Sequence, residues 1–291
     1  MPDISVIIPA YREEKVIVQV VSRVRQVLDT AKKNYELLVI DDGSDDNTAG
    51  EAQRAGARVF SHPYNIGNGA AVKTGIRKAK GKILVMMDGD GQHSPEDIPR
   101  LLEHMDSYDM AVGARSNDSQ TSPHRNLANR IYNIFATYIC KREIEDLTSG
   151  FRAMRADMAH RFVSMLPNTF SYPTTITLAV VRGGYSLVYV PITTRLRVGQ
   201  SKIKLFKDGS RFLLIIVKIA TLFSPMRIFL PVSGFMFFLG LGWGLFKIFF
   251  MHAPYGPTSA MLMTMAVVVF MVGLVSEQIA QLRYDRSEPR E

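Results

Sequence analysis

Two long apolar segments near the carboxyl end of the chain, Ile228–Met251 and Ala260–Val275, restrict its fold more than any other feature. The first carries a single charge, Lys247, and as a helix would rise ~36 Å, enough to cross a hydrocarbon core of ~30 Å. The second would rise ~24 Å, so its span must continue through Glu277 towards Arg283. We therefore predict a transmembrane hairpin in which Glu277 faces a partner helix or the membrane interface.

The basic residues are concentrated beside this hairpin. The stretch Arg195–Arg227 holds eight basic residues and one acid, Asp208, and so carries most of the formal net charge of +8. A basic run next to an apolar segment favours anionic lipid headgroups, each cation adding roughly 1 kcal/mol. Basic residues flank the ends of the hairpin and not its connecting turn, which predicts a multi-pass protein of the cell (inner) membrane with its amino-terminal domain and both termini cytoplasmic. The remainder is close to neutral and has no nucleic-acid motif, so a nucleic-acid partner is not expected.

The first two thirds of the chain alternate short apolar runs with segments of helical periodicity. Strands are predicted at Ser5–Ile8, Glu36–Ile40, Arg58–Phe60, Ile83–Met87, Met110–Val112 and Leu187–Val190. Helices are predicted at Glu13–Ala31, Thr48–Ala55, Ala70–Ala79, Pro95–His104, Arg125–Tyr138 and Tyr172–Val181, with Thr48 and Ser94 as N-caps. This alternation indicates an α/β fold whose mostly parallel sheet is covered by helices on both faces.

The segment Phe206–Phe223 combines an apolar stripe with basic residues on its other faces, which is typical of an amphipathic helix at a membrane surface. A helix packed on the sheet is the alternative interpretation. We expect four parts: a domain of residues 1–204, a juxtamembrane helix of residues 205–227, two transmembrane helices in residues 228–283, and a tail of residues 284–291. In the first transmembrane segment, Gly240 and Gly244 form a small-residue pair that suits close helix packing.

The strongest chemical signal is the sequence Asp88-Gly89-Asp90-Gly91-Gln92, which directly follows a predicted buried strand. Ligands of parallel sheets bind beyond the carboxyl ends of the strands. Carboxylates are the ligands that Mg2+ and Mn2+ prefer, and a divalent cation can neutralise a departing diphosphate. Gly89 permits close approach of that diphosphate. An acidic loop without a ligand is the alternative, because one Asp-x-Asp pattern is weak evidence alone.

Two other strand ends carry polar residues. Pro9-Ala10-Tyr11-Arg12-Glu13 follows the first strand, and Asp41-Asp42-Gly43-Ser44 follows the second. The Tyr11 ring is suited to lie against a base, and Asp41 or Asp42 to accept hydrogen bonds from a base or a ribose. Turn chemistry is the alternative for each loop taken alone. The glycines of Asn65–Gly75 do not fit the dinucleotide pattern, and we expect them to let the backbone approach the nucleotide. Cys140 is the single cysteine, which excludes an intrachain disulfide and a thiolate zinc cluster.

The chain resembles the family 2 glycosyltransferases with a GT-A, Rossmann-like fold, and among them the dolichol-phosphate mannose synthase-like enzymes that act on polyprenyl phosphates. The resemblance rests on the three loops above and on two further motifs, Asp146-Leu147-Thr148-Ser149-Gly150-Phe151-Arg152 and Gly199-Gln200-Ser201-Lys202. It runs through most of Ile4–Lys202, and a two-helix hairpin follows the catalytic domain in several members. Relatives tend to have Leu where this chain has Gly91 and serine near Asn129, and the arginine spacing before Ser201-Lys202 is shifted, so that Arg195 and Arg197 are both eligible.

The resemblance implies roles for individual residues. The nucleotide sugar would be bound by Pro9, Ala10, Tyr11, Glu13, Asp41 or Asp42, Asp88, Gly89, Arg197 and Lys202. Asp88, Asp90 and Gln92 would surround Mg2+ or Mn2+. Arg115 and Arg125 would hold the acceptor phosphate, and together with Asp90 they form the expected catalytic set.

The implied reaction transfers a sugar from a UDP- or GDP-linked donor to a polyprenyl or dolichyl phosphate, with inversion in a single displacement. A processive polysaccharide synthase is an alternative, but the Gln-x-x-Arg-Trp motif expected there is missing, since the single tryptophan, Trp243, lies in an apolar segment. A nucleotidyltransferase would need a glycine-arginine phosphate loop near the amino terminus, which is also missing. A membrane scaffold that keeps the fold without turnover stays open, as does a homo-oligomer.

Overall fold

The computed structural model describes the chain apart from residues 116–132, 170, 195–220, 222 and 286–291. The chain divides into two compact units, Met1–Lys202 and Ile203–Glu291, here called the amino-terminal and carboxyl-terminal units. The predicted juxtamembrane helix, Phe206–Phe223, lies almost entirely outside the described residues, so both interpretations of it stay open. The finer division of the second unit into spans and tail likewise stays a prediction.

The amino-terminal unit is built on one seven-stranded sheet with the order β3-β2-β1-β4-β6-β5-β7. Its strands are β1 (Ile4–Ala10), β2 (Tyr35–Asp41), β3 (Arg58–Ser61), β4 (Ile83–Met86), β5 (Met110–Arg115), β6 (Arg152–Arg155) and β7 (Leu187–Ile192). All neighbouring strands are parallel except β6, which lies antiparallel between β4 and β5. The predicted α/β fold with a mostly parallel sheet is therefore confirmed.

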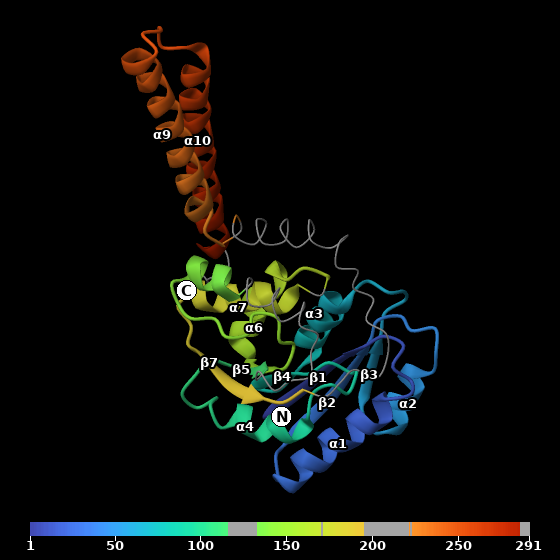
Figure 1. The fold of residues 1–291 in the computed structure, drawn as a ribbon. Helices are drawn as coiled ribbons and strands as arrows, with labels where there is room; N and C mark the ends of the chain where they lie inside the picture. Colours follow the sequence, from blue (N-terminus) through green and yellow to red (C-terminus); the bar gives the residue numbers. More distant parts are fainter. Residues whose placement is uncertain (116–132, 170, 195–220, 222, 286–291) are drawn as a thin grey trace. The chain divides into compact units, whose positions relative to one another are not determined.

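Helices cover both faces of this sheet. They are α1 (Ile17–Thr30), α2 (Thr48–Arg54), α3 (Asn68–Lys78), η1 (Pro95–Asp97), α4 (Ile98–Leu102), α6 (Ala156–Phe162), η2 (Val163–Met165) and α7 (Tyr172–Arg182). In Figure 1, α1 and α4 lie on one face of the sheet, and α3, α6 and α7 lie on the other. The strands are apolar because both faces are covered: all seven residues of β1 are buried. Gly75 on α3 lets that helix approach the sheet, since a Cβ there would lie 2.3 Å from Ile7 Cγ2.

Two local predictions need correction. The predicted helix Glu13–Ala31 begins only at Ile17, so Glu13 lies in the loop that follows β1. Asn47, not Thr48, occupies the N-cap position of α2, and no side chain caps this helix. The Thr48 hydroxyl instead accepts a hydrogen bond from the Glu13 main-chain N–H at 2.9 Å. Of the predicted helix Arg125–Tyr138, residues 133–140 are described and are helical.

The carboxyl-terminal unit contains the predicted hairpin of α9 (Met226–Phe250) and α10 (Pro257–Asp285), each long and apolar enough to cross a membrane. Gly240 and Gly244 lie where the hairpin is packed closely. A Cβ on Gly240 would lie 2.9 Å from Leu262 Cβ, and one on Gly244 would lie 2.0 Å from the Tyr255 ring. Glu277 faces the partner helix as predicted, since its Oε2 accepts a hydrogen bond from the Met226 N–H at 3.2 Å.

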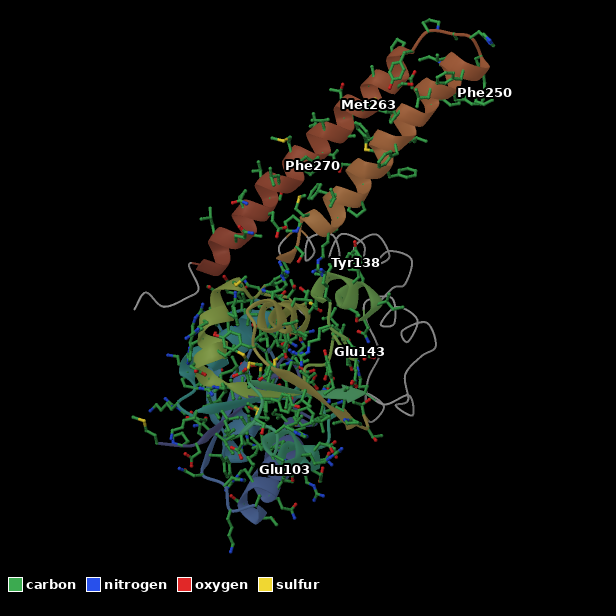
Figure 2. All side chains as sticks on the ribbon, turned by 90° about the vertical axis from the view of Figure 1, so that its left-hand side faces the viewer. Glu103, Tyr138, Glu143, Phe250, Met263 and Phe270 are labelled. Atoms are coloured by element: carbon green, nitrogen blue, oxygen red, sulfur yellow. The ribbon has the colours of Figure 1, made fainter. Side chains whose placement is uncertain are left out.

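Large apolar side chains cover the outside of this hairpin. Phe250, at the end of α9, is 75% exposed, and Val267, Met271 and Val275 of α10 are exposed as well. Figure 2 shows the side chains along both helices. The buried residues of α9 are instead small: Ser233, Gly240 and Gly244. Such a surface suits lipid and not water, so this unit anchors the protein in a membrane.

Candidate active site

The polar loops predicted from the sequence meet at one edge of the sheet. The Asp42 N–H donates to the Ala10 carbonyl at 2.9 Å, which joins the ends of β2 and β1. The Gly89 N–H donates to the Pro9 carbonyl at 3.3 Å, which joins the end of β1 to the loop after β4. Glycine suits this position, since a Cβ on residue 89 would lie 3.0 Å from the Pro9 carbonyl oxygen, which is closer than most Cβ contacts. The loops at the carboxyl ends of β2, β1 and β4 are thus joined to one another by main-chain hydrogen bonds.

Asp42 is a buried carboxylate whose two oxygens are already bonded. Oδ1 accepts the Ile66 N–H at 3.1 Å and lies 2.7 Å from His62 Nδ1, while Oδ2 accepts the Gly67 N–H at 2.8 Å. His62 Nε2 in turn lies 2.9 Å from the Thr74 hydroxyl on α3. Asp42 therefore shapes the loop of residues 62–67, with little capacity left for a ligand.

Asp41 is buried as well, but its carboxylate is less engaged. Its Oδ1 accepts the Ser44 N–H at 3.2 Å, and no described residue donates to Oδ2. Next to it, Arg12 adopts a left-handed backbone conformation with φ of 58° and donates its N–H to the Ser44 hydroxyl. Its guanidinium pairs with Asp45 through two bonds of 2.6 Å and lies over the Tyr11 ring. Of the pair left open by the sequence, Asp41 is the one whose carboxylate keeps an oxygen without a described donor.

Asp88 follows β4 and remains partly accessible, with 31% of its side chain exposed. Its Oδ2 lies 3.7 Å from Nε2 of the buried His93, whose ring stacks on Phe151. Gly150 faces the same carboxylate, because a Cβ there would lie 2.7 Å from Asp88 Oδ2. Desolvation opposes ionisation of Asp88, but His93, Asn68 and the charge of Arg152 outweigh it and lower the pKa of Asp88 below its usual value.

The carboxylates after β4 fit part of a coordination shell for a hard cation. Asp90 Oδ1 accepts the Gln92 N–H at 3.1 Å, so the turn that carries both residues is ordered around this carboxylate. Within the described ranges, no group of three or more His, Cys, Asp or Glu side chains could enclose an ion. Mg2+ is commonly held by one or two carboxylates together with substrate phosphates, and that donor set agrees with these residues.

Arg115 lies at the end of β5 and forms a buried ion pair with Asp146. Its Nε donates to Asp146 Oδ2 at 2.7 Å, and its Nη2 donates to Oδ1 at 2.8 Å and to the Thr148 hydroxyl. Burial opposes both charges, but the pair prevails, raising the pKa of Arg115 and lowering that of Asp146. Within the described part of the chain, Nη1 of Arg115 has no bonded partner. Asp146 and Thr148 therefore hold the Arg115 side chain in a fixed orientation at the end of β5.

Gly67, just before α3, and Gly69, in its first turn, let another segment of the chain approach closely. A Cβ on Gly67 would lie 2.2 Å from the Asn168 carbonyl oxygen, and one on Gly69 would lie 2.1 Å from that of Pro167. Gly67 also has φ of 125°, which a side chain would strain. These glycines therefore admit the protein's own segment 167–169, while the expected approach of a nucleotide to this backbone stays a prediction.

Sequence reasoning missed several residues of this site. Asp146, Thr148 and Gly150 lie in a motif that carried the family resemblance, and His93 directly follows the Asp88–Gln92 loop, but the resemblance assigned none of them a role. The short spacing of Asp146 and Thr148 was the available signal, because such a pair suits a turn that binds a side chain. Arg125, Arg197 and Lys202 lie outside the described residues.

A mostly parallel sheet with paired aspartates at its carboxyl edge defines an enzyme of the nucleotide-binding α/β class. The chain matches the family described as "Glycosyl transferase family 2" over residues 5–162 and the family described as "GtrB C-terminal hairpin" over residues 224–282.

Individual relatives agree with this match. An undecaprenyl-phosphate 4-deoxy-4-formamido-L-arabinose transferase of Edwardsiella ictaluri is 28% identical over 314 residues, covering 99% of this chain and 92% of that protein. A polyprenol monophosphomannose synthase of Mycolicibacterium smegmatis is 32% identical over 215 residues, covering 68% and 79%. The fold is similar to that of glucosyl-3-phosphoglycerate synthase from Mycobacterium tuberculosis, solved with Mn2+, UDP-glucose and phosphoglyceric acid, with a TM-score of 0.61 at 19% identity over 76% of this chain and 79% of that one.

The chain therefore belongs to glycosyl transferase family 2, and it is a glycosyltransferase with a membrane hairpin at its carboxyl end. The family resemblance seen in the sequence is confirmed.

Proposed function

We propose that this glycosyltransferase moves a sugar from a UDP- or GDP-linked donor to a polyprenyl or dolichyl phosphate at the cytoplasmic face of the membrane. The names of the relatives support a lipid-phosphate acceptor: one is an undecaprenyl-phosphate transferase and another a polyprenol monophosphomannose synthase. The membrane hairpin supports it too, because an anchored enzyme stays beside a lipid substrate.

The observation that carries the proposal is that one loop, residues 146–150, lies against both Arg115 and Asp88. Residues 146–150 contact Arg115 at one end, through Asp146, and face Asp88 at the other, through Gly150. The charge of Asp88 also contributes to the raised pKa of Arg115, so the two side chains act on one another electrostatically. A carboxylate suited to a metal-bound diphosphate and an arginine suited to a phosphate thus share one site.

On the donor side, we assign the nucleotide to Pro9, Ala10, Tyr11, Glu13 and Asp41, with Asp42 shaping the neighbouring loop. Asp88, Asp90 and Gln92 would hold Mg2+ or Mn2+, with Gly89 leaving room for the diphosphate. The bound cation would neutralise charge on the departing nucleoside diphosphate.

On the acceptor side, we assign the lipid phosphate to Arg115 and Arg125. Arg197 and Lys202 would contact either the donor diphosphate or this phosphate, as the family resemblance implies. A phosphate monoester has a second pKa near ~6, so it is mostly dianionic at pH 7 and needs no catalytic base. Arg115 would hold it in line with the sugar, since its fork is fixed in place by Asp146 and Thr148. Single displacement then inverts the anomeric carbon, and an α-linked donor gives a β-linked product.

The test uses the full chain in detergent with a short polyprenyl phosphate. Radiolabelled UDP- and GDP-sugars are screened with Mg2+ or Mn2+, and the organic phase is extracted. We expect metal-dependent label in that phase and its loss in Asp90→Ala. Nucleotide release without lipid-linked label would contradict the acceptor, and an α-linked product from an α-linked donor would contradict the single displacement.

A further inference from the structure

Arg152 occupies a central position beneath the site. It opens β6, where it pairs with Met86 of β4 on one side and with Val112 of β5 on the other. Asp88 lies two residues after Met86, and Arg115 lies three residues after Val112. Because β6 runs antiparallel to both strands, its first residue lies at the carboxyl edge of the sheet, between the two strands that deliver the charged groups.

Arg152 is also a fully buried charge with unusual partners. Its exposed fraction is 0%, and no described carboxylate lies within ion-pair distance. The guanidinium instead binds main chain and a hydroxyl: Nη1 donates to the Pro173 carbonyl at 3.2 Å and to the Thr177 hydroxyl at 3.1 Å, and Nη2 donates to the Ser149 carbonyl. Burying an unpaired charge is costly, so a role beyond filling space is expected for this side chain.

The contacts of Arg152 fix the loop that joins the two halves of the site. The Ser149 carbonyl is held by Arg152, and the Ser149 N–H donates to Asp146 Oδ1 at 3.1 Å. The next residue, Gly150, is thereby pressed against the Asp88 carboxylate. Pro173 and Thr177 tie the same guanidinium to α7. One side chain therefore anchors the loop to a helix at the point where the loop touches Asp88.

Electrostatics agrees with this geometry. Desolvation lowers the pKa of Arg152, while the charges of Asp146 and Asp88 act in the opposite direction. Arg152 in turn is one of the groups that lower the pKa of Asp88. The two acids on either side of the loop thus offset part of the cost of burying this cation.

We propose that Arg152 is a positioning residue that holds the Ser149–Gly150 peptide against Asp88 and so sets this carboxylate for the metal-bound diphosphate. The inference rests on the proposed function, in which Asp88 faces the cation and Arg115 faces the acceptor phosphate. Arg152 touches neither substrate.

The experiment measures the Mn2+ concentration that half-saturates nucleotide binding, with UDP and separately with GDP, on the full chain in detergent. The variants are Arg152→Met, Thr177→Val, which removes one acceptor of the guanidinium, and Gly150→Ala, which places a methyl 2.7 Å from Asp88 Oδ2. Arg155→Met is the matched control, because Arg155 lies on the same strand but is exposed and pairs with Asp157. Thermal midpoints are recorded for every variant.

We expect the half-saturating Mn2+ concentration to rise about tenfold or more in Arg152→Met, as is usual when a group behind a metal ligand is lost. Thr177→Val and Gly150→Ala should give smaller rises in the same direction, and Arg155→Met should match the wild type. If Arg152→Met does not accumulate as folded protein, the other two variants decide.

A lower thermal midpoint with a wild-type Mn2+ dependence would overturn the proposal and leave Arg152 as a structural residue. The same Mn2+ dependence in Gly150→Ala as in the wild type would overturn it too, because the loop would then not set Asp88. Failure of the proposed function is a separate result: the wild type itself would bind neither nucleotide with Mn2+, or would bind one and make no lipid-linked sugar.

Discussion

The two units of this protein distribute their polar and apolar side chains in opposite ways. In the amino-terminal unit, charged groups such as Asp42, Asp146 and Arg152 are buried and bonded, and they cluster at the edge of the sheet. In the hairpin, the buried positions of α9 are Ser233, Gly240 and Gly244, and large apolar side chains face outward. A unit that folds in water is held together by burial of apolar surface, and the few charges buried with it need bonded partners. Helices in lipid gain little from apolar burial, so close packing of small residues must hold them together.

This contrast predicts that loss of one buried charge damages the amino-terminal unit most. Asp146→Ala leaves Arg115 buried without its partner, so we expect a loss of about 3–5 kcal/mol in the free energy of unfolding. Asp157→Ala is the control, since its pair with Arg155 is exposed and worth about 1 kcal/mol or less. Denaturant unfolding of the full chain in detergent measures both. Equal losses in the two variants would contradict the comparison.

The ion pair of Arg115 and Asp146 also makes the free energy of unfolding depend on pH. The folded pKa of Asp146 is lowered, so its contribution to stability is present above its unfolded pKa of about 3.9 and is lost as the pH falls through the folded value. The wild type should therefore lose more unfolding free energy between pH 7 and pH 3 than Asp146→Ala does. An equal acid sensitivity in both proteins would show that the pair does not stabilise the fold.

The hairpin should respond to added volume. Gly240→Ala places a methyl 2.9 Å from Leu262 Cβ and 3.0 Å from the Ser259 carbonyl oxygen, and we expect a loss of about 1–3 kcal/mol in hairpin stability. Gly242→Ala is the matched control on the same helix, because no atom lies within 4 Å of a Cβ there. Thermal denaturation in detergent, followed by the helical signal, compares them. A larger loss in the control would break the packing argument.

Asp41 and Asp42, neighbours at the end of β2, are predicted to have different roles, one in nucleotide binding and one in stability. Asn in place of Asp42 cannot accept all the bonds from His62, Ile66 and Gly67, so Asp42→Asn should lower the unfolding free energy by about 1–3 kcal/mol. Asp41→Asn keeps its single acceptor bond to Ser44 and should instead weaken nucleotide binding at nearly unchanged stability. Calorimetry and nucleotide titration of both variants check the assignment, and a reversed pattern would exchange the two roles.

Much of the fold was predictable because its signals are local. Continuous apolar runs placed β2 to β5 within one to three residues of their observed ends, and segment length alone identified the hairpin. For β6, the sequence indicates a polar loop from Asp146 that runs into a strand, but nothing in these residues shows that the strand lies antiparallel between β4 and β5. Strand order depends on pairing between distant residues, which leaves no periodic pattern.

The site was predictable in position and less so in detail. Asp41, Asp42, Asp88 and Asp90 were expected at the strand ends, and the sheet places them there. Their individual roles depend on which oxygens are already bonded, as the three partners of Asp42 illustrate. The pairing of Arg115 with Asp146 joins residues 31 positions apart, so neither motif alone predicted it.

The smallest expected effect concerns Glu277, an acid of α10 whose carboxylate meets the first turn of α9. α9 has no side-chain cap and no acid in its first turn, so Glu277 of α10 supplies a carboxylate to the Met226 N–H. Glu277→Gln retains an oxygen acceptor but removes the negative charge from the positive end of α9. We expect a loss of about 0.3–1 kcal/mol in hairpin stability, measured by thermal denaturation in detergent. Glu277→Leu, which also removes the acceptor, should cost more, because the Met226 N–H at this half-buried helix end then loses its carboxylate partner. If both variants match the wild type in stability, the Glu277 carboxylate does not stabilise the hairpin. Buried, bonded charges would then stabilise only the amino-terminal unit, and packing of small residues would stabilise the hairpin.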